Sequence, residues 1–273
     1  MTEQGFLALT PQYSPTRALL AAAARRRGMA VEVLSTGGGA ASLRGRPGGH
    51  YYGGPKYADR VADDLGVALL VPGDGWLCTL PEEFTRRTIA LSTLSEVREL
   101  SGPLFVKPPS DKSFPAAVYA DGCSLPAGTE LPPDLPVQVS EVVVWAAEFR
   151  LYVLDGEVRT ASQYATYGLL DPLPLDTTHR HHDTALAFAR SLLDSCAAGL
   201  PSAVVLDIGL LDPTGDWAVV EANMAWFSSC YAADPDRALD TVLRSAGPCE
   251  DLQGRDRPYL HKAAVHLADP FAG

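Results

Sequence analysis

Two carboxylates and one amide lie on the two strands of a predicted β-hairpin in the C-terminal half of the sequence. Apolar runs at residues 203–211 and 217–223 are joined by Asp-Pro-Thr-Gly, which places Pro and Gly where a type I turn favours them. The numbers of residues that pair across a hairpin have a constant sum, which is 427 at the ends of this turn and 428 for Asp207 and Glu221. These two side chains are therefore expected to face each other within one residue of register, and Asn223 shares the face of Glu221.

This arrangement requires a positive charge or a proton. The residues that flank Asp207 and Glu221 are apolar, and two carboxylates that face each other in an apolar hairpin repel and lose hydration. Three oxygen ligands without His or Cys suit a hard divalent cation such as Mg²⁺. The alternative is that one carboxylate is protonated or paired with an arginine, and geometry alone leaves both interpretations open.

Basic residues upstream of the hairpin could bind phosphate groups. Lys107 ends a predicted strand over residues 104–107, and Lys112 lies in the polar loop that follows. Lysines at such positions can hold a polyphosphate as point charges, although loop lysines are more often simply solvated. Glu148 and Arg150 share one face of a second predicted strand, where the alternative is a cross-strand ion pair. The sequence has no G-x-x-x-x-G-K-[ST] motif, which excludes a P-loop protein.

The elements that must position these residues fall into two predicted domains. Residues 1–85 begin with a strand, a helix and a strand joined by short connections, which indicates a parallel α/β sheet. Residues 86–273 combine strands, hairpins and helices in an α+β domain. The individual predictions are strands at 6–9, 31–34, 67–71, 104–107, 137–144, 148–154, 157–161, 203–211 and 217–223, and helices at 15–27, 58–65, 81–100, 183–198 and 235–246.

Composition excludes several classes of protein. The chain of 273 residues has 22 Lys and Arg against 33 Asp and Glu, a net charge of −11, so we expect no nucleic-acid and no membrane partner. Five cysteines without a Cys-x-x-Cys motif argue against a disulfide scaffold or a zinc ribbon. No apolar run approaches the roughly 20 residues of a membrane helix, and the N-terminus does not resemble a signal peptide. We therefore expect a cytoplasmic protein; its oligomeric state is left open.

Taken in order, these motifs resemble the ATP-grasp superfamily, and within it the clade named for one arginine and two lysines. The resemblance extends from about residue 104 to residue 244. The Asp…Glu-x-Asn hairpin is moderately specific on its own, whereas the ordered set is strongly specific. Its segments are Phe-Val-Lys-Pro (105–108), Ser-Asp-Lys-Ser-Phe (110–114), Val-Ser-Glu-Val-Val (139–143), Glu-Phe-Arg (148–150), Val-Leu-Asp-Ile-Gly (205–209) and Val-Val-Glu-Ala-Asn (219–223).

The resemblance implies an ATP-grasp-like domain in which ATP lies between two β-sheets. A pre-ATP-grasp-like domain would precede it, and residues 103–140 would form a lid over the nucleotide. Lys107 and Lys112 would contact phosphates, and Glu148 would bind the ribose hydroxyls. The other implied roles are a hinge against the adenine edge at Glu141, Val142, Val143 and Val144, and a Mg²⁺ site on the β- and γ-phosphates at Asp207, Glu221 and Asn223.

Two departures from the family pattern concern the groups that face the phosphates. Many members carry an arginine two residues before the metal-binding aspartate, where this sequence has Val205. Arg150 is the candidate to replace that catalytic cation, and Arg159 is the second candidate. The loop that covers the phosphates is also usually rich in glycine, which this one is not, so Lys112 itself is expected to hold the phosphates and close the site.

The implied function is an ATP- and Mg²⁺-dependent carboxylate–amine ligase that acts on an amino acid or peptide. Such an enzyme forms an amide bond through an acyl phosphate and releases ADP and phosphate. The two lysines, an arginine and Mg²⁺ would offset the repulsion between the substrate carboxylate and the γ-phosphate. The alternatives are a phosphotransferase on a small substrate, and a nucleotide-binding module without turnover.

Overall fold

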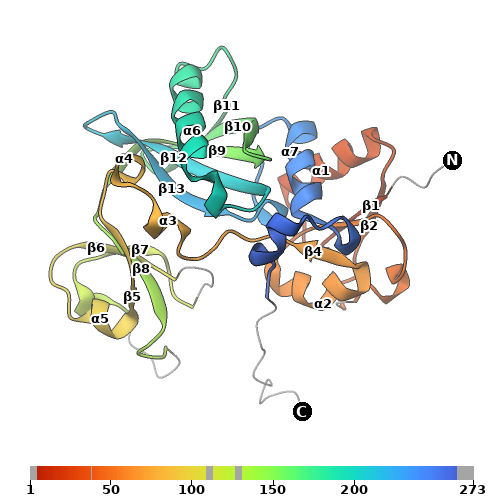
Figure 1. The fold of residues 1–273 in the computed structure, drawn as a ribbon, viewed down its shortest axis with the longest axis horizontal. Helices are drawn as coiled ribbons and strands as arrows, with labels where there is room; N and C mark the ends of the chain where they lie inside the picture. Colours follow the sequence, from red (N-terminus) through yellow and green to blue (C-terminus); the bar gives the residue numbers. More distant parts are fainter. Residues whose placement is uncertain (1–4, 38, 109–112, 127–130, 263–273) are drawn as a thin grey trace.

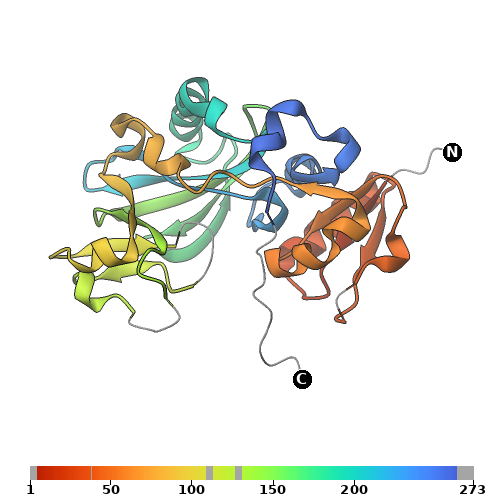
Figure 2. The ribbon, with the colours of Figure 1, turned by 60° about the horizontal axis from the view of Figure 1, so that its bottom comes forward.

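The computed structural model describes residues 5–37, 39–108, 113–126 and 131–262. Sheets of three, four and five strands follow one another along these residues (Figure 1), and a two-stranded sheet joins the N- and C-terminal regions. Figure 2 shows the three-stranded and the four-stranded sheet at opposite ends of the five-stranded sheet. No helix in the described ranges is long and apolar enough to cross a bilayer.

The N-terminal sheet is parallel, as the strand–helix–strand pattern predicts, and has the order β2-β1-β3. Its first helix begins where the Ser14 hydroxyl accepts a hydrogen bond from the backbone N–H of Arg17, with proline at the next position. The elements are β1 (Phe6–Leu9), α1 (Pro15–Arg26), β2 (Ala30–Val33), β3 (Gly49–Tyr52) and α2 (Pro55–Leu65).

The third strand of this sheet is β3. The strand predicted at 67–71 belongs to a different sheet. Its first three residues, β4 (Val67–Leu69), pair antiparallel with β14 (Ala246–Pro248) near the end of the described chain. Sequence analysis missed β3 because a strand that starts Gly-His gives no apolar run.

The four-stranded sheet has the order β5-β8-β6-β7, and its strand β5 divides the long helix predicted over residues 81–100 into two short helices. The Thr93 hydroxyl accepts from the Glu96 N–H, and the Glu96 carboxylate accepts from the Thr93 N–H, so this capping box starts a new helix after a strand. The elements of this region are α3 (Trp76–Thr79), α4 (Glu82–Thr85), β5 (Ile89–Thr93), α5 (Leu94–Arg98), β6 (Leu104–Lys107), β7 (Ala117–Tyr119) and β8 (Pro136–Ser140).

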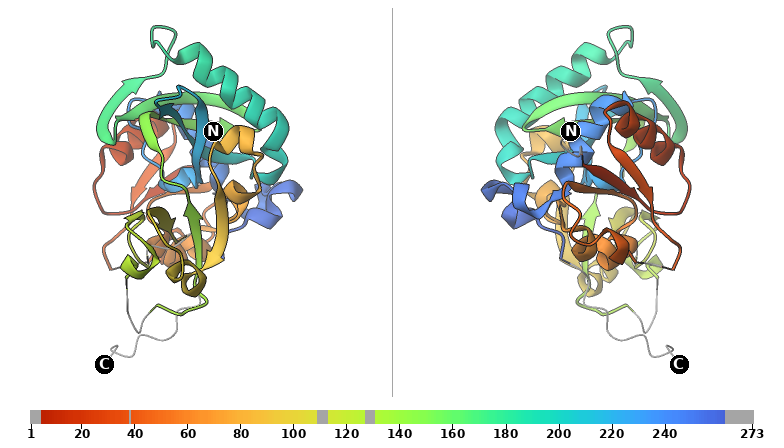
Figure 3. Two further views of the ribbon diagram at one scale, coloured as in Figure 1. Left: turned by 90° about the vertical axis from the view of Figure 1, so that its left-hand side faces the viewer. Right: turned by 90° about the vertical axis from the view of Figure 1, so that its right-hand side faces the viewer.

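The five-stranded sheet, in the order β11-β10-β9-β12-β13, carries a long helix on the face away from the four-stranded sheet (Figure 3). The predicted strand at 137–144 is in fact divided, because the chain leaves one sheet after Ser140 and enters the other at Val144. The strands of the five-stranded sheet and its helix are β9 (Val144–Leu154), β10 (Glu157–Thr166), β11 (Leu169–Pro174), α6 (His182–Cys196), β12 (Ala203–Asp212) and β13 (Trp217–Asn223).

The hairpin between β9 and β10 has the predicted turn, with Asp155 at φ 53° and Gly156 at φ 81°. Strand β11 was missed because Pro172 and Pro174 interrupt its pattern. Both prolines are tolerated because β11 is the edge strand of the sheet.

Helix α7 (Pro235–Ser245) joins the N-terminal sheet to the five-stranded sheet. One apolar core contains Leu7 and Leu20 from the N-terminal region, Tyr152 and Val205 from the five-stranded sheet, and Leu239 from α7. Short 3₁₀ turns complete the fold: η1 (Ala41–Leu43), η2 (Gly122–Ser124), η3 (Ala197–Gly199), η4 (Ala225–Phe227), η5 (Cys249–Asp251) and η6 (Gly254–Tyr259). The domain boundary near residue 85 stays a prediction.

We predict that Leu239→Ala lowers the free energy of unfolding by about 2–5 kcal/mol, because it leaves a cavity in this fully buried shared core. Urea unfolding followed by fluorescence and by circular dichroism should show one coincident transition. Leu19→Ala, on the exposed side of α1, is the matched control and should change stability by less than about 0.5 kcal/mol. A variant with two separate transitions would contradict the shared core.

Candidate active site

A cleft that opens to solvent lies between the four-stranded and the five-stranded sheet, with about 650 Å³ of space in and above it. Strands β6 and β8 form one wall, and β13 forms part of the other. The segment that crosses between the sheets closes one end, where Glu141, Val142 and Val143 line the cleft. Lys107 and Glu221 also line it, so two groups of residues predicted from sequence share one cavity.

The carboxylates face each other as the hairpin arithmetic predicts. Asp207 pairs with Glu221 across β12 and β13, and the register shifts by one residue between Asp207 and Ile208. The sum of pair numbers is 427 on the turn side of this bulge and 428 beyond it. The amide nitrogen of Asn223 donates to an oxygen of Asp207 at 3.1 Å and to an oxygen of Glu221 at 2.9 Å. The three proposed metal-binding side chains therefore form one hydrogen-bonded group.

Arg150 neutralises Asp207 from the neighbouring strand. The Nε and NH2 groups of Arg150 donate to the two carboxylate oxygens at 2.8 and 2.7 Å. Asp207 is 1 % exposed, and burial raises the pKa of its carboxyl while the Arg150 charge opposes that rise. The pair is the arginine alternative that sequence analysis left open for this carboxylate.

Lys107 neutralises Glu221 from across the cleft. Its ammonium donates to a Glu221 oxygen at 2.6 Å, which links β6 of the four-stranded sheet to β13 of the five-stranded sheet. Burial opposes ionisation of Glu221, but the Lys107 charge and the hydrogen bonds from Lys107 and Asn223 outweigh it and lower the pKa of the carboxyl. Each carboxylate thus has its own cation.

Two stacked tyrosine rings lie against the guanidinium of Arg150. The rings of Tyr164 and Tyr231 lie 5.2 Å apart at an interplanar angle of 15°, and the Arg150 guanidinium lies 5.5 and 5.3 Å from their centroids. The Tyr164 hydroxyl donates to Glu148 at 2.7 Å. Burial raises the pKa of the Glu148 carboxyl, and this hydrogen bond opposes the rise. Sequence analysis missed both tyrosines, because an isolated tyrosine, in a strand like Tyr164 or in a turn like Tyr231, is most simply a packing residue.

Arg87 is a further residue that sequence analysis missed. It lines the cleft, is 8 % exposed, and donates to the carbonyl oxygens of Thr85 at 2.9 Å and Val219 at 2.8 Å. Its guanidinium lies 5.0 Å from the ring centroid of Trp145. No carboxylate pairs with Arg87 among the residues that the structure describes. Burial lowers its pKa to about 10, so the side chain remains cationic at neutral pH. Arg87 lies two residues before β5, in a segment that sequence analysis expected to be helical, so no sequence signal pointed to it.

Several residues named from sequence do not line the cleft, and one lies outside the described residues. Glu148, Arg150, Asp207 and Asn223 lie beside the lining residue Glu221 rather than in the lining itself, and Val144 and Arg159 are also absent from it. Val144 is 51 % exposed and is not among the residues that line the cleft. Arg159, the second candidate for the phosphate-facing cation, lines a different cavity, where it pairs with Asp240. Lys112 is the residue outside the described ranges, and its lid role stays a prediction. Of the two arginine candidates, Arg150 is therefore the one beside the carboxylates.

The donor set fits a hard divalent cation. Asp207, Glu221 and the carbonyl oxygen of Asn223 are the oxygen ligands that Mg²⁺ takes, and two protein cations already occupy the space where positive charge is needed. The described residues contain no group of three or more His, Cys, Asp and Glu side chains arranged to hold a metal. Two carboxylates and an amide would therefore need further ligands from a bound phosphate.

Comparison with known proteins identifies this architecture as that of an ATP-grasp protein. The family model that matches describes the ATP-grasp domain of the clade named for one arginine and two lysines, family 2, and it covers residues 84–241, more than half of the chain. The protein belongs to this ATP-grasp family, which confirms the resemblance inferred from the ordered motifs. No curated protein matches the sequence.

Comparison with solved structures gives one match whose TM-score indicates the same fold. The RimK domain protein ATP-grasp from Sphaerobacter thermophilus DSM 20745 matches with a TM-score of 0.53 and 16 % identity, over 87 % of this chain and 99 % of that one. D-alanine–D-alanine ligase from Bacillus anthracis matches with a TM-score of 0.48 and 13 % identity, over 89 % and 97 % of the two chains. At these identities the first likeness shows the ATP-grasp fold alone.

We predict that Arg150→Met is destabilised by about 3–5 kcal/mol at pH 8, because it leaves the buried Asp207 carboxylate without a cation. Loss of Arg150 raises the already elevated pKa of Asp207 further. A carboxyl whose pKa is higher in the folded than in the unfolded state stabilises the fold when protonated, and this stabilisation is lost as pH rises through the folded pKa. The deficit should therefore be smaller at pH 5 than at pH 8.

Urea unfolding at the two pH values measures this difference. The double variant Arg150→Met with Asp207→Asn is the control, because it removes the titrating group and should show the same deficit at both pH values. If the single variant lost the same unfolding free energy at pH 5 and at pH 8, the ionised state of Asp207 would not depend on Arg150.

Proposed function

We propose that this protein is an ATP- and Mg²⁺-dependent carboxylate–amine ligase that acts on an amino acid or peptide. The observation that carries the proposal is the pair of facing carboxylates, Asp207 and Glu221, each held by its own cation at the cleft between two sheets. Membership of the ATP-grasp family supports the use of ATP. The ordered motifs support the acyl-phosphate chemistry.

In this proposal the nucleotide lies in the cleft between the sheets. The backbone of residues 141–143 faces the adenine edge, and Glu148 binds the ribose hydroxyls. Lys107 and Arg87 contact phosphates, because both cations line the cleft and Arg87 has no carboxylate partner within the described ranges. Arg87 is an addition to the residues inferred from sequence, and it supplies a buried positive charge that is already in position when an anion binds.

Asp207, Glu221 and Asn223 would hold Mg²⁺, which supplies charge neutralisation at the β- and γ-phosphates. The protein side chains prepare this position in advance. The hydrogen bonds from the Asn223 amide nitrogen hold the two carboxylates together, and the amide would turn to present its carbonyl oxygen to the cation. Burial of Asp207 keeps water from competing for it.

The proposed reaction has two steps. A carboxylate oxygen of the first substrate attacks the γ-phosphorus, and the bond to the bridging oxygen breaks to release ADP. The nitrogen of the second substrate then attacks the acyl carbon, the bond from that carbon to the phosphate oxygen breaks, and the leaving phosphate takes up the proton that the amine loses. Arg150 lies beside the carboxylates, where it can face the transferring phosphoryl group, and the ring pair Tyr164 and Tyr231 positions its guanidinium.

We predict that Glu221→Gln abolishes the Mg²⁺ dependence of ATP binding and lowers ADP release by at least about 100-fold, because it removes one ligand charge and keeps the shape. Equilibrium binding of ATP at increasing Mg²⁺, and ADP release with the active substrate, measure the two effects. Glu157→Gln, at the exposed start of β10, is the control and should resemble the parent. Unchanged Mg²⁺ dependence in Glu221→Gln would remove this residue from the metal site.

The reaction type is tested by capture of the acyl phosphate. We expect that ATP, Mg²⁺ and hydroxylamine, supplied with a panel of amino acids and dipeptides but without an amine acceptor, yield a hydroxamate detectable by mass spectrometry. A phosphotransferase on an alcohol would give a stable phosphate ester and no hydroxamate. A binding module would be protected by ATP against heating, yet would release no ADP with any substrate tried. Either of these two results would contradict the ligase.

A further inference from the structure

Residues 228–232 form the support segment, which carries Tyr231 against the guanidinium of Arg150. Tyr231 has a φ of 50°, in the left-handed region that a bulky side chain rarely adopts. Such a conformation costs free energy, persists only where the surroundings hold the backbone, and is found mostly at functional sites. Here it places the ring centroid 5.3 Å from the central carbon of the Arg150 guanidinium. The contacts that hold the support segment therefore also set the position of this ring.

The N-terminal region supplies two of the hydrogen bonds that hold the support segment. The Thr16 hydroxyl, at the start of α1, accepts from the Cys230 N–H at 3.0 Å. The Tyr52 hydroxyl, at the end of β3, donates to the Ser228 carbonyl oxygen at 3.2 Å. Thr16 and Tyr52 are each 5 % exposed, so water does not readily replace either contact. Thr16 thus anchors the residue directly before Tyr231.

The five-stranded sheet also holds the support segment. The Tyr152 hydroxyl donates to the Ser228 carbonyl oxygen at 2.9 Å, and the Ser162 hydroxyl accepts from the Ala232 N–H at 3.1 Å. Tyr152 and Ser162 are fully buried. The Tyr231 ring is therefore placed by two parts of the fold, of which only the five-stranded sheet also carries the arginine that the ring contacts.

We propose that Thr16 and Tyr52 are positioning residues for Arg150, so that the N-terminal region sets the direction of the catalytic cation. The inference rests on the proposed function, because it gives these residues a role in the ligase reaction. A guanidinium that turns from Asp207 toward a phosphoryl group keeps its contact with the Tyr231 ring, whose position Thr16 and Tyr52 set. A displaced support segment would misdirect Arg150 in the transition state and leave the ATP contacts unchanged.

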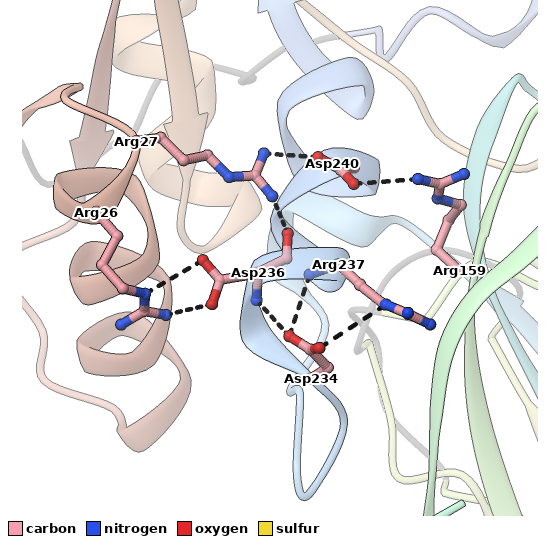
Figure 4. A network of polar contacts seen from close by, with 7 residues as sticks. All are labelled: Arg26, Arg27, Arg159, Asp234, Asp236, Arg237 and Asp240. Carbon is pink, nitrogen blue, oxygen red and sulfur yellow. Dashed lines mark hydrogen bonds and ion pairs between the residues drawn. The ribbon is translucent and has the colours of Figure 1, made fainter. Parts of the chain in front are cut away.

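A second contact between the N-terminal region and the C-terminal half provides a matched control. Figure 4 shows Arg26, at the end of α1, which pairs with Asp236 in the first turn of α7 at 2.6 Å. The two side chains are 53 % and 42 % exposed, and within the described ranges neither forms a hydrogen bond with the support segment. Arg26→Gln therefore alters the same helix as Thr16 without touching the support of Tyr231.

The Arg150 side chain can report its own position. In protein labelled with ¹⁵N-arginine, its Nε–H is buried and bonded to Asp207, so it should give a slowly exchanging NMR signal that the tyrosine ring currents displace. Tyr231→Leu removes one ring and should move this signal furthest. Thr16→Val removes the hydroxyl and should move it in the same direction, whereas Thr16→Ser keeps the hydroxyl and should not. Arg26→Gln should leave the signal where it is in the parent.

Turnover gives a second readout. With the substrate that yields the hydroxamate, Thr16→Val should lower kcat by about 10-fold or more and change the KM for ATP by less than about twofold, because orientation matters most in the transition state. Tyr52→Phe keeps the ring and leaves Tyr152 as a donor to Ser228, so it should show the same split with a smaller loss. Thr16→Ser should restore kcat.

The unliganded Tm of each variant shows that it folds, and Tyr52→Phe decides if Thr16→Val does not. The proposal is overturned if both variants leave the Arg150 signal unchanged, if Thr16→Ser moves the signal as far as Thr16→Val, or if the signal moves and kcat does not fall below that of Arg26→Gln. Failure of the ligase is seen separately, as a parent protein that gives no hydroxamate. The NMR comparison needs no substrate, so it still decides whether Thr16 and Tyr52 position Arg150.

Discussion

The structure depends on how it offsets the repulsion between two carboxylates on paired neighbouring strands. Asp207 and Glu221 are adjacent across β12 and β13, and both would be destabilising without compensation. The fold resolves this with two cations that come from different places. Arg150 comes from the neighbouring strand of the same sheet, and Lys107 comes from the sheet across the cleft. The first pair fixes the interior of one sheet, and the second pair ties the two sheets together.

This difference in origin gives the two ion pairs different strengths. Arg150 and Asp207 form a two-point contact with little exposure, 12 % and 1 % of the side chains, so removal of either partner leaves a buried charge. Lys107 and Glu221 form a single contact on a partly exposed carboxylate, and the Lys107 ammonium is a point charge on a flexible stem. Breaking the contact between Lys107 and Glu221 therefore costs less free energy than breaking the contact between Arg150 and Asp207. Movement of the four-stranded sheet would break the Lys107 contact and leave the Arg150 contact intact.

The sequence was sufficient to predict that Asp207 and Glu221 face each other, but it predicted the surrounding helices and strands less well. Hairpin arithmetic placed Asp207 opposite Glu221 because a short turn fixes register, and the bulge accounts for the single residue of uncertainty. Strand β3 was not predictable, because its Gly-His start has no apolar period and its pairing with β1 is a long-range contact. The helix expected over 81–100 failed for a local reason, since the Thr93 capping box starts a helix in the middle of it. Arg87 lay beyond sequence reasoning because the burial of its guanidinium against the cleft is visible only in three dimensions.

The buried Arg150 pair also constrains what Arg150 can do under the proposed function. Its guanidinium can turn toward a phosphoryl group only if another positive charge takes its place at Asp207, since an isolated buried carboxylate costs several kcal/mol. A divalent cation held by Asp207, Glu221 and Asn223 is the natural replacement, because the same oxygens would bind it. Occupation of the metal position and release of the arginine are then one event. The tyrosine pair at 5.3–5.5 Å would keep the released guanidinium beside the site and away from bulk solvent.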